Sequence, residues 1–461
     1  MSVSSGFFLR GAIWTIGAYG LGQGLRLATN IFLARLLAPE LFGIMLIVNS
    51  LRMGIELISD VGIGQNIVYH KNANDPDFYN TAWTLQAIRS VALWLVAVAV
   101  AIPVANFYQS PILAYILPLT AFGIVLSGFT SVSRALLQKR MQIRRLNAFE
   151  MIISVISSAG YVLLAYFSPN LWALVFGGLF ASAVTMVGSY FLLPGFRERL
   201  YLSKSYVLEI LHFGKWIFFS SIVYFVSTNF DRLYLAKVVP LDVLGVYGIA
   251  RSISELVGMV VLRLGNYVLF PLIASQAQTP RAELRSQLAP IRMKFLLVAA
   301  IGFSVFAATA DLPIRLLYDQ RYQAAAWMLP IMIVGSWASM LAVINESLVL
   351  GLGKPSYGAF ANVSKFAFLL IVLPITVGRY GVLGGVIVIA LADLCRYIPI
   401  VIGQKREHFS FGKQDLVLTL VCFLAMALWQ WIRWMMGFGT SFDSLPMHLI
   451  AVIFEPGLQG T

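Results

Sequence analysis

Thirteen stretches of this 461-residue chain are predominantly apolar over about 20 residues, the length that an α-helix needs to cross the hydrocarbon core of a bilayer. Each stretch therefore predicts one membrane-spanning helix. The expected spans are residues 11–36, 41–64, 85–107, 112–136, 149–168, 171–193, 213–238, 243–270, 291–310, 327–352, 357–378, 381–402 and 415–436. Only 11% of the residues are charged, whereas soluble domains carry roughly 25%, so a soluble enzyme and a disordered chain are excluded.

The two ends of the chain need separate treatment. The first span is too long and too rich in glycine for the short apolar core of a cleaved signal peptide, so we expect it to remain in the protein. After the thirteenth span only residues 447–454 are apolar again, and this stretch is too short to cross a bilayer. The sequence leaves open whether these residues belong to a shortened fourteenth helix.

Basic residues gather in the connections that follow even-numbered spans. These connections hold Lys71, Lys139, Arg140, Arg144, Arg145, Arg197, Arg199, Lys204, Arg281, Arg285, Lys354, Lys405, Arg406 and Lys413. On the other side Arg315 and Arg321 are the main exceptions, and each has an aspartate nearby. Because basic connections stay in the cytoplasm, the N-terminus is predicted to be cytoplasmic. The net charge of +13 is thus mostly loop charge facing the membrane surface, and no nucleic-acid partner is expected.

The two halves of the chain repeat at an offset of 202 residues. Leu33-Ala34-Arg35-Leu36-Leu37 aligns with Leu235-Ala236-Lys237-Val238-Val239, and Glu40-Leu41-Phe42-Gly43 aligns with Asp242-Val243-Leu244-Gly245. Both members join an odd-numbered span to an even-numbered one, so the repeat is parallel. It predicts an all-α polytopic membrane protein with two pseudo-symmetric bundles around a central cavity, an arrangement that favours transport by alternating access. The expected parts are an N-terminal six-helix bundle (1–193), an amphipathic cytoplasmic linker (194–212), a C-terminal six-helix bundle (213–402), and an additional helix with the tail (403–461).

Charged residues at bilayer depth cost about 2.5–3.5 kcal/mol each on insertion scales, so they usually face a cavity or a partner. They are Arg26, Arg52, Glu56, Asp60, Asp231, Arg232, Arg251, Glu255, Arg263, Glu346, Lys365, Asp393 and Arg396. Three pairs are close enough on one helix to neutralise each other in a purely structural role, namely Arg52–Glu56, Arg251–Glu255 and Asp393–Arg396. Four others need a neighbouring helix, a ligand or water: Arg26, Arg263, Glu346 and Lys365. Asp231 and Arg232 lie near the outer end of their span, where snorkelling to the surface is the simplest interpretation.

An excess of arginine over carboxylate near the bilayer centre suits an anionic cargo, because a guanidinium group stays charged and binds phosphate oxygens in pairs. The acidic residues at the same depth are candidates to take up a proton or a sodium ion. Glycines crowd the first span at Gly17, Gly20, Gly22 and Gly24. They predict close helix packing, with bending of the first helix during gating as the alternative.

Motifs for other chemistries are missing from the sequence. Gly353-Lys354 and Gly412-Lys413 lack the Ser or Thr that would complete a phosphate-binding loop, so ATP hydrolysis is not expected. The four histidines are isolated, and Cys395 and Cys422 both lie within apolar stretches. Neither a metal site, a disulfide framework nor a bound cofactor is therefore predicted.

Three segments resemble a known family. They are Leu33-Ala34-Arg35-Leu36-Leu37-Ala38-Pro39-Glu40-Leu41-Phe42-Gly43, the stretch Leu136-Leu137-Gln138-Lys139-Arg140-Met141, and Asp231 with Leu244-Gly245-Val246-Tyr247. All three are similar to segments of Wzx-type oligosaccharide flippases, the polysaccharide exporters of the multidrug/oligosaccharidyl-lipid/polysaccharide (MOP) superfamily. The resemblance extends over nearly the whole chain, although its motifs are shared with other members of that superfamily.

The resemblance implies a transporter of the bacterial inner membrane, not an enzyme. Such proteins flip undecaprenyl-diphosphate-linked sugar units to the outer leaflet for lipopolysaccharide or exopolysaccharide biosynthesis, and polymerases and glycosyltransferases are their expected partners. Related flippases place arginines in helices 1, 2 and 8, which implies that Arg26, Arg52 and Arg251 bind the diphosphate. Arg263 and Lys365 are further candidate cavity charges. The candidates for coupling to H⁺ or Na⁺ are Asp60, Glu255, Glu346 and Asp393.

Two other functions stay open at this point. A multidrug antiporter of the same superfamily would need an acidic, aromatic cavity for cationic drugs, whereas the central charges here are mainly basic. A membrane-embedded polysaccharide polymerase or ligase would need a substantial outer loop for its catalytic residues, whereas the outer connections here are short.

Overall fold

The computed structural model describes residues 5–58, 62–69, 75–140, 142–193, 198–264 and 280–445. Within these ranges all regular secondary structure is helical, which confirms the expected all-α fold. Two predictions, the coupling role of Asp60 and a fourteenth span at residues 447–454, concern positions outside the described residues.

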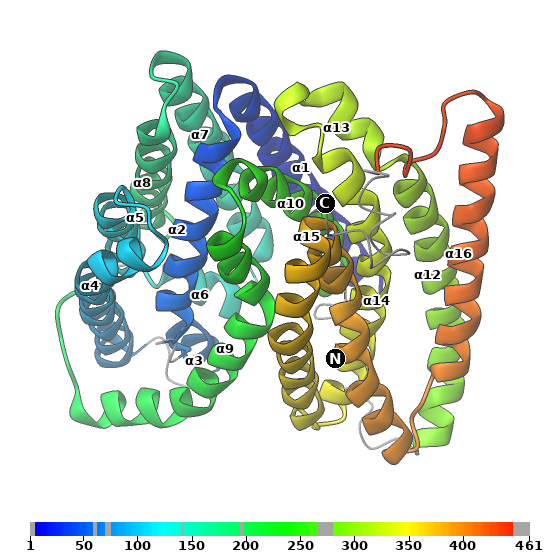
Figure 1. Ribbon diagram of the computed structural model, residues 1–461. Helices are drawn as coiled ribbons and strands as arrows, with labels where there is room; N and C mark the ends of the chain where they lie inside the picture. Colours follow the sequence, from blue (N-terminus) through cyan, green and yellow to red (C-terminus); the bar gives the residue numbers. More distant parts are fainter. Residues whose placement is uncertain are drawn as a thin grey trace. The chain divides into compact units, whose positions relative to one another are not determined.

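The first half of the chain forms long helices joined by short connections (Figure 1). They are α1 (Ser5–Leu36), α2 (Pro39–Ile58), α3 (Ile63–Tyr69), α4 (Pro76–Phe107), α5 (Leu113–Gly128), α6 (Ser133–Lys139), α7 (Ile143–Phe167), α8 (Leu171–Ser189) and α9 (Lys204–Val238). Capping residues fix two of the helix starts. The side chain of Asp75 accepts the N–H of Asp77 at the start of α4 (3.1 Å), and that of Asn170 accepts the N–H of Trp172 at the start of α8 (3.0 Å).

The described residues of the second half also form helices. Its helices are α10 (Leu241–Leu264), α12 (Arg281–Thr309), α13 (Asp311–Leu317), the short 3₁₀-helix η2 (Gln320–Tyr322), α14 (Ala325–Gly351), α15 (Ser356–Arg406) and α16 (Gly412–Met435). In the apolar stretch of α14, 78% of the residues are buried, against 17% in α16. Helix α14 is therefore at the centre of this half, whereas α16 exposes most of its apolar side chains.

As far as the described residues reach, each of the thirteen expected spans is largely helical, but span 41–64 is divided between α2 and α3, and span 112–136 between α5 and α6. Among these residues, seven helices are long and apolar enough to cross a membrane, or eight if the bent pair α5 and α6 is one span with a 53° bend. One of the seven is α15, in which two expected spans are joined at Gly381. The backbone of Gly381 has φ +59° and ψ −150°, a conformation open to glycine but not to helical residues.

The helix boundaries agree with the sequence repeat. Three boundaries recur at the offset of 202 residues, pairing Leu36 with Val238, Pro39 with Leu241, and Phe107 with Thr309. Each of the first three long helices of one half therefore shares one boundary with its counterpart in the other half, in agreement with a parallel repeat.

Residue contacts divide the chain into two compact units. The N-terminal unit comprises Met1–Phe225 and Arg232–Asp242, and the C-terminal unit comprises Val226–Asp231 and Val243–Thr461. The division therefore runs through α9 and the start of α10, which differs from the boundaries at residues 193 and 213 expected from the sequence. The physical reason is that the first turns of α9 pack on helices of the N-terminal unit, as described next.

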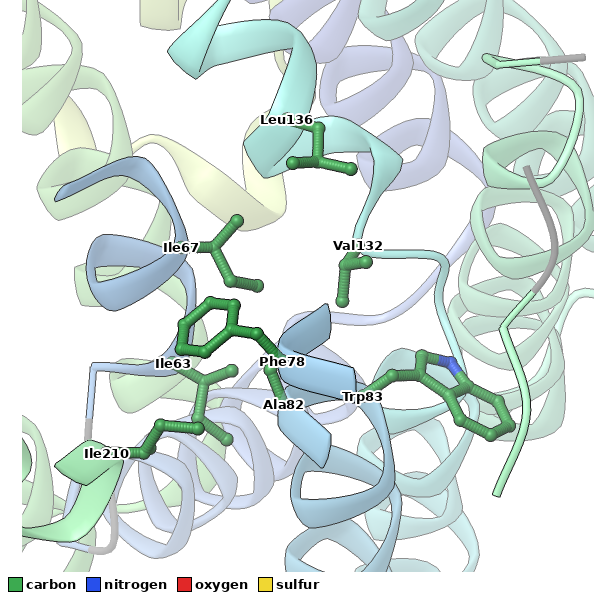
Figure 2. Packing of buried hydrophobic residues seen from close by; sticks show 8 residues of the cluster. All are labelled: Ile63, Ile67, Phe78, Ala82, Trp83, Val132, Leu136 and Ile210. Carbon is green, nitrogen blue, oxygen red and sulfur yellow. The ribbon is translucent and has the colours of Figure 1, made fainter. Parts of the chain in front are cut away.

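A hydrophobic cluster in the N-terminal unit joins four helices (Figure 2). It consists of Ile63 and Ile67 of α3, Phe78, Ala82 and Trp83 of α4, Val132 and Leu136 at α6, and Ile210 of α9. Tyr206 packs its ring edge-on against Phe78, with ring centroids 5.3 Å apart. The start of α9 is thereby part of the N-terminal core. Residues 198–203 before it have no regular secondary structure, so the described part of the expected linker is an irregular segment followed by the first turns of a long helix.

Against the residues that the structure describes, the α1 glycines show no close packing, which contradicts that prediction. A β-carbon added at any of Gly17, Gly20, Gly22 and Gly24 would meet nothing within 4 Å. Helices instead approach closely at other glycines. A β-carbon at Gly335 of α14 would lie 2.5 Å from the carbonyl oxygen of Ala390 in α15, so this position admits no side chain.

Candidate functional site

Arg26 and Arg52 come from neighbouring helices of the N-terminal unit, α1 and α2. Both guanidinium groups are close enough to the Tyr161 hydroxyl of α7 to act on it electrostatically. The Arg52 side chain also lies over Gly123 of α5, where an added β-carbon would be 3.5 Å from Nη1. The N-terminal unit thus brings two of the predicted diphosphate ligands to the same region.

Among the described residues, no carboxylate forms an ion pair with either arginine. Among the described residues, every ion pair within 4.0 Å involves other groups, and the buried Nε of Arg52 has no hydrogen-bond partner. The predicted pair between Arg52 and Glu56 does not form, because the Arg52 side chain extends toward α5. This region of the N-terminal unit is therefore cationic.

Arg251 belongs to the C-terminal unit and has a different environment. Its Nε is 3.1 Å from Glu255 Oε1 on the same helix and 3.5 Å from Asp231 Oδ2 on α9. The Tyr247 hydroxyl donates a hydrogen bond of 2.5 Å to the same oxygen of Asp231. The predicted pair with Glu255 is confirmed. The snorkelling interpretation of Asp231 is wrong, since this residue is only 2% exposed.

Two more ion pairs extend this cluster onto α14 and α15. Lys365 Nζ donates to Asp393 Oδ1 at 2.9 Å, and Arg396 pairs with Glu346. The predicted pair of Asp393 with Arg396 is replaced by a contact within α15 across its break at Gly381 (Lys365–Asp393) and by a contact between α15 and α14 (Arg396–Glu346). Asp393 and Arg251 also interact electrostatically. The C-terminal unit therefore contains a connected set of four carboxylates and three bases, namely Asp231, Glu255, Glu346, Asp393, Arg251, Lys365 and Arg396.

The remaining candidates can be placed only in part. Arg263 is on α10, but its side chain is outside the described part of the structure, as is the whole of Asp60. Among the described residues, no three His, Cys, Asp or Glu side chains are arranged to hold a metal ion.

Sequence reasoning missed a buried polar node that joins α12, α14, α15 and α16. Arg292 of α12 is only 3% exposed and pairs with Asp415, the acidic residue in the first turn of α16. The other oxygen of Asp415 accepts hydrogen bonds from Asn345 (2.9 Å) and Tyr397 (2.7 Å). The sequence feature that could have indicated this node is the presence of a polar residue toward one end of each of four expected spans.

A second missed pair fixes the other end of α16. Arg433 forms two hydrogen bonds to the Asp311 carboxylate, at 2.5 and 2.7 Å, and a third to the carbonyl oxygen of Ala308 (2.7 Å). Helix α16 is thus tied to the α12–α13 region at both of its ends, and Figure 1 draws α12 and α16 side by side.

Sequence comparisons find similarity to proteins named for polysaccharide biosynthesis. A family model described as "Polysaccharide biosynthesis protein" matches residues 32–327. The chain is 24% identical to the lipopolysaccharide biosynthesis protein WzxC of Escherichia coli, over 75% of this chain and 67% of that protein. It is 23% identical to the succinoglycan biosynthesis transport protein ExoT of Rhizobium meliloti, over 81% of this chain and 74% of that protein.

A solved structure shares the fold. The lipid II flippase MurJ in an inward closed conformation superimposes with a TM-score of 0.73, at 13% identity, covering 96% of this chain and 99% of that one. MATE transporters of the MOP superfamily have the same fold.

Proposed function

The chain belongs to the polysaccharide biosynthesis protein family within the MOP superfamily, and from that membership we propose that it flips undecaprenyl-diphosphate-linked oligosaccharide repeat units from the inner to the outer leaflet. It is a multi-pass membrane transporter and not an enzyme. Relatives named for lipopolysaccharide biosynthesis and for succinoglycan transport support a lipid-linked sugar as the cargo.

The observation that carries this proposal is the uncompensated positive charge of Arg26 and Arg52. Two guanidinium groups acting on the same tyrosine hydroxyl, without a carboxylate between them, suit the two phosphates of a diphosphate. A hydrogen bond to a charged group contributes about 1.5–3 kcal/mol. Loss of one such arginine is therefore expected to weaken binding roughly 10- to 100-fold.

Arg251 has a conditional role in this proposal. Its charge is shared with Glu255 and Asp231, so it is available to a phosphate only when these carboxylates are neutralised. Uptake of H⁺ or Na⁺ by the C-terminal cluster would release Arg251, which would couple an ion gradient to cargo binding. Glu255, Glu346 and Asp393 are the coupling candidates that the structure describes. Arg263 and Lys365 remain proposed cavity charges, and Asp60 remains a proposed coupling residue.

Export in a bacterial strain that lacks its own flippase gene tests the cargo site. We expect Arg26→Ala and Arg52→Ala to reduce surface polysaccharide strongly, and Arg251→Ala to reduce it as well. Arg134→Ala is the matched control, because Arg134 pairs with Glu150 at a site that is 40% exposed and should not affect export. Protein abundance in the membrane is measured in parallel.

Intact export in all three variants would remove the proposed diphosphate site. Resistance to cationic dyes without any restoration of export would instead favour the multidrug antiporter. Lengthened glycan made by the purified protein without a gradient would favour a polymerase or ligase.

Reconstituted vesicles test the coupling. With lipid-linked oligosaccharide supplied on one side, transport should depend on an imposed proton or sodium gradient, and Asp393→Asn and Glu255→Gln should abolish that dependence. Transport that is equally fast without any gradient would contradict the coupling role. We also propose the bacterial inner membrane as the location, and the polymerase and glycosyltransferases of the same polysaccharide as partners, since they use and supply the cargo.

A further inference from the structure

Residues 198–203 form an irregular segment that is bonded along one face of α4. The amide N–H groups of alternate residues donate to polar side chains of that helix, with Arg199 bonded to Asn80 (2.8 Å), Tyr201 to Thr84 (3.0 Å) and Ser203 to Thr81 (3.0 Å). The two leucines between these donors are turned away from α4. Leu200 is 75% exposed and Leu202 is 51% exposed. A segment held this firmly therefore displays two large apolar side chains.

The first turns of α9 continue the segment with three distinct faces. At 3.6 residues per turn, Tyr206 and Ile210 share one face, and they are the residues that enter the N-terminal core. Lys204, Leu208 and Leu211 share a second face, on which the two leucines are 60% and 46% exposed. A third face carries Ser205, Glu209 and His212, all exposed. A helix with one face on protein, one apolar face and one polar face suits the boundary between lipid and water.

The acidic and basic side chains at this segment also differ in what they contact. Glu209 lies on the polar face, and the other acidic residues at this segment are engaged on the protein side. Glu198 accepts hydrogen bonds from Ser131 and Val132, and Asp75 accepts one from the Tyr206 hydroxyl (2.7 Å). The Tyr201 hydroxyl donates to the Asp77 carboxylate (3.3 Å), which raises the pKa of that hydroxyl above its ordinary value.

The basic side chains, by contrast, are exposed next to the leucines. Arg199 precedes Leu200, and Lys204 lies on the same helical face as Leu208 and Leu211. Leucines flanked by exposed bases are complementary to acyl chains beneath phosphate head groups.

We propose that residues 198–211, the inner strap, are an in-plane binding surface for anionic phospholipid. The four exposed leucines insert at the level of the upper acyl chains, and Arg199 and Lys204 bind the phosphate oxygens of the head groups. The strap is anchored to α4 and to the N-terminal core, so lipid binding holds the N-terminal unit at a fixed depth. This inference concerns the lipid around the protein and does not depend on the identity of the cargo.

Spin labels in the full-length protein test the depth of the strap. Single cysteines are placed at Leu208, at Leu211 and, as controls on the polar face, at Ser205 and Glu209, in a background of Cys395→Ser and Cys422→Ala. In vesicles of phosphatidylethanolamine and phosphatidylglycerol, labels at 208 and 211 should be accessible to oxygen and protected from a water-soluble nickel chelate. Labels at 205 and 209 should show the reverse.

The preference for anionic lipid has its own measurement. The oxygen-to-nickel accessibility ratio at 208 should fall when phosphatidylcholine replaces phosphatidylglycerol, and the variant Arg199→Gln/Lys204→Gln should lose that difference. Equal accessibility at 208 and 205 would overturn the proposal. A label at 208 shielded from both reagents would also overturn it, because a partner protein or a second copy would then cover the strap. Insertion that is the same in both lipids would overturn the anionic preference.

Discussion

Basic residues at bilayer depth look alike in the sequence, but in the structure they differ in whether a carboxylate pairs with them. Within the part of the chain that the structure describes, Arg26 and Arg52 have no carboxylate partner, whereas Lys365 and Arg396 are each matched with one. A paired buried charge serves the fold as well as any function, because removing its partner leaves an uncompensated charge in a low-dielectric environment. Substitutions in the C-terminal cluster must therefore be judged on stability before they are judged on transport.

The contribution of a buried ion pair to stability can be tested on Lys365 and Asp393. We expect Lys365→Met or Asp393→Asn alone to lower the free energy of unfolding by about 3–5 kcal/mol, and the double variant to lose much less, because it leaves no unpaired charge. Unfolding of the purified protein in detergent measures both. The exposed pair Arg134–Glu150 is the control, since breaking it should cost about 1 kcal/mol or less. Losses that simply add in the double variant would show that these two side chains are not coupled.

At the scale of helices, the sequence predicts where helices lie along the chain far better than which of their side chains form ion pairs. The spans are set by the length of apolar stretches, a local property, and eleven of the thirteen each fall in one helix as far as the described residues reach, whereas 41–64 and 112–136 are each divided between two. Ion pairs depend on how each helix is rotated and on which helices are neighbours, and neither is a local property. Asp393 therefore pairs with Lys365, 28 residues away, and not with Arg396 three residues away. The Arg292–Asp415 node escaped prediction for the same reason.

The break inside α15 gives a prediction about one helical element. Gly381 has φ +59° and ψ −150°, which a residue with a β-carbon adopts at a cost of about 1–3 kcal/mol. Gly381→Ala should therefore lower the thermal stability of the purified protein. Gly378→Ala is the control, because Gly378 is in the same helix with nothing within 4 Å of an added β-carbon, and alanine favours a helix by about 1 kcal/mol. Equal stabilities of the two variants would mean that the break is not held in this conformation.

At the scale of the whole chain, the two halves share a framework but not its charges. At the offset of the repeat, Arg52 corresponds to Ser254, and Arg251 corresponds to Asn49. The duplicated helices therefore carry an unpaired cationic region in one unit and a mixed acidic and basic cluster in the other. This asymmetry is what a transporter needs if one unit binds an anion and the other responds to a cation, and it supports the division of roles that we propose.

The orientation of the chain is the remaining whole-molecule prediction. In the N-terminal unit the N–H of Ser131, between α5 and α6, donates to the hydroxyl of Ser189 at the end of α8 (2.8 Å), so the connections that follow the fourth and sixth expected spans share one side of the membrane. Connections after odd-numbered spans occupy the other side, where Lys237 bonds to the carbonyl oxygen of Phe107. Because the first group carries most of the bases, we expect it to be cytoplasmic.

Labelling of intact cells with a membrane-impermeant maleimide tests this orientation. In a background of Cys395→Ser and Cys422→Ala, Gln109→Cys and Asn170→Cys should be labelled from outside, because both positions are in connections after odd-numbered spans. Gln142→Cys, in an exposed connection of the opposite kind, should react only after the membrane is permeabilised. Labelling of Gln142→Cys in intact cells, with protection of the other two, would reverse the orientation, and the inner strap would then face the outer leaflet.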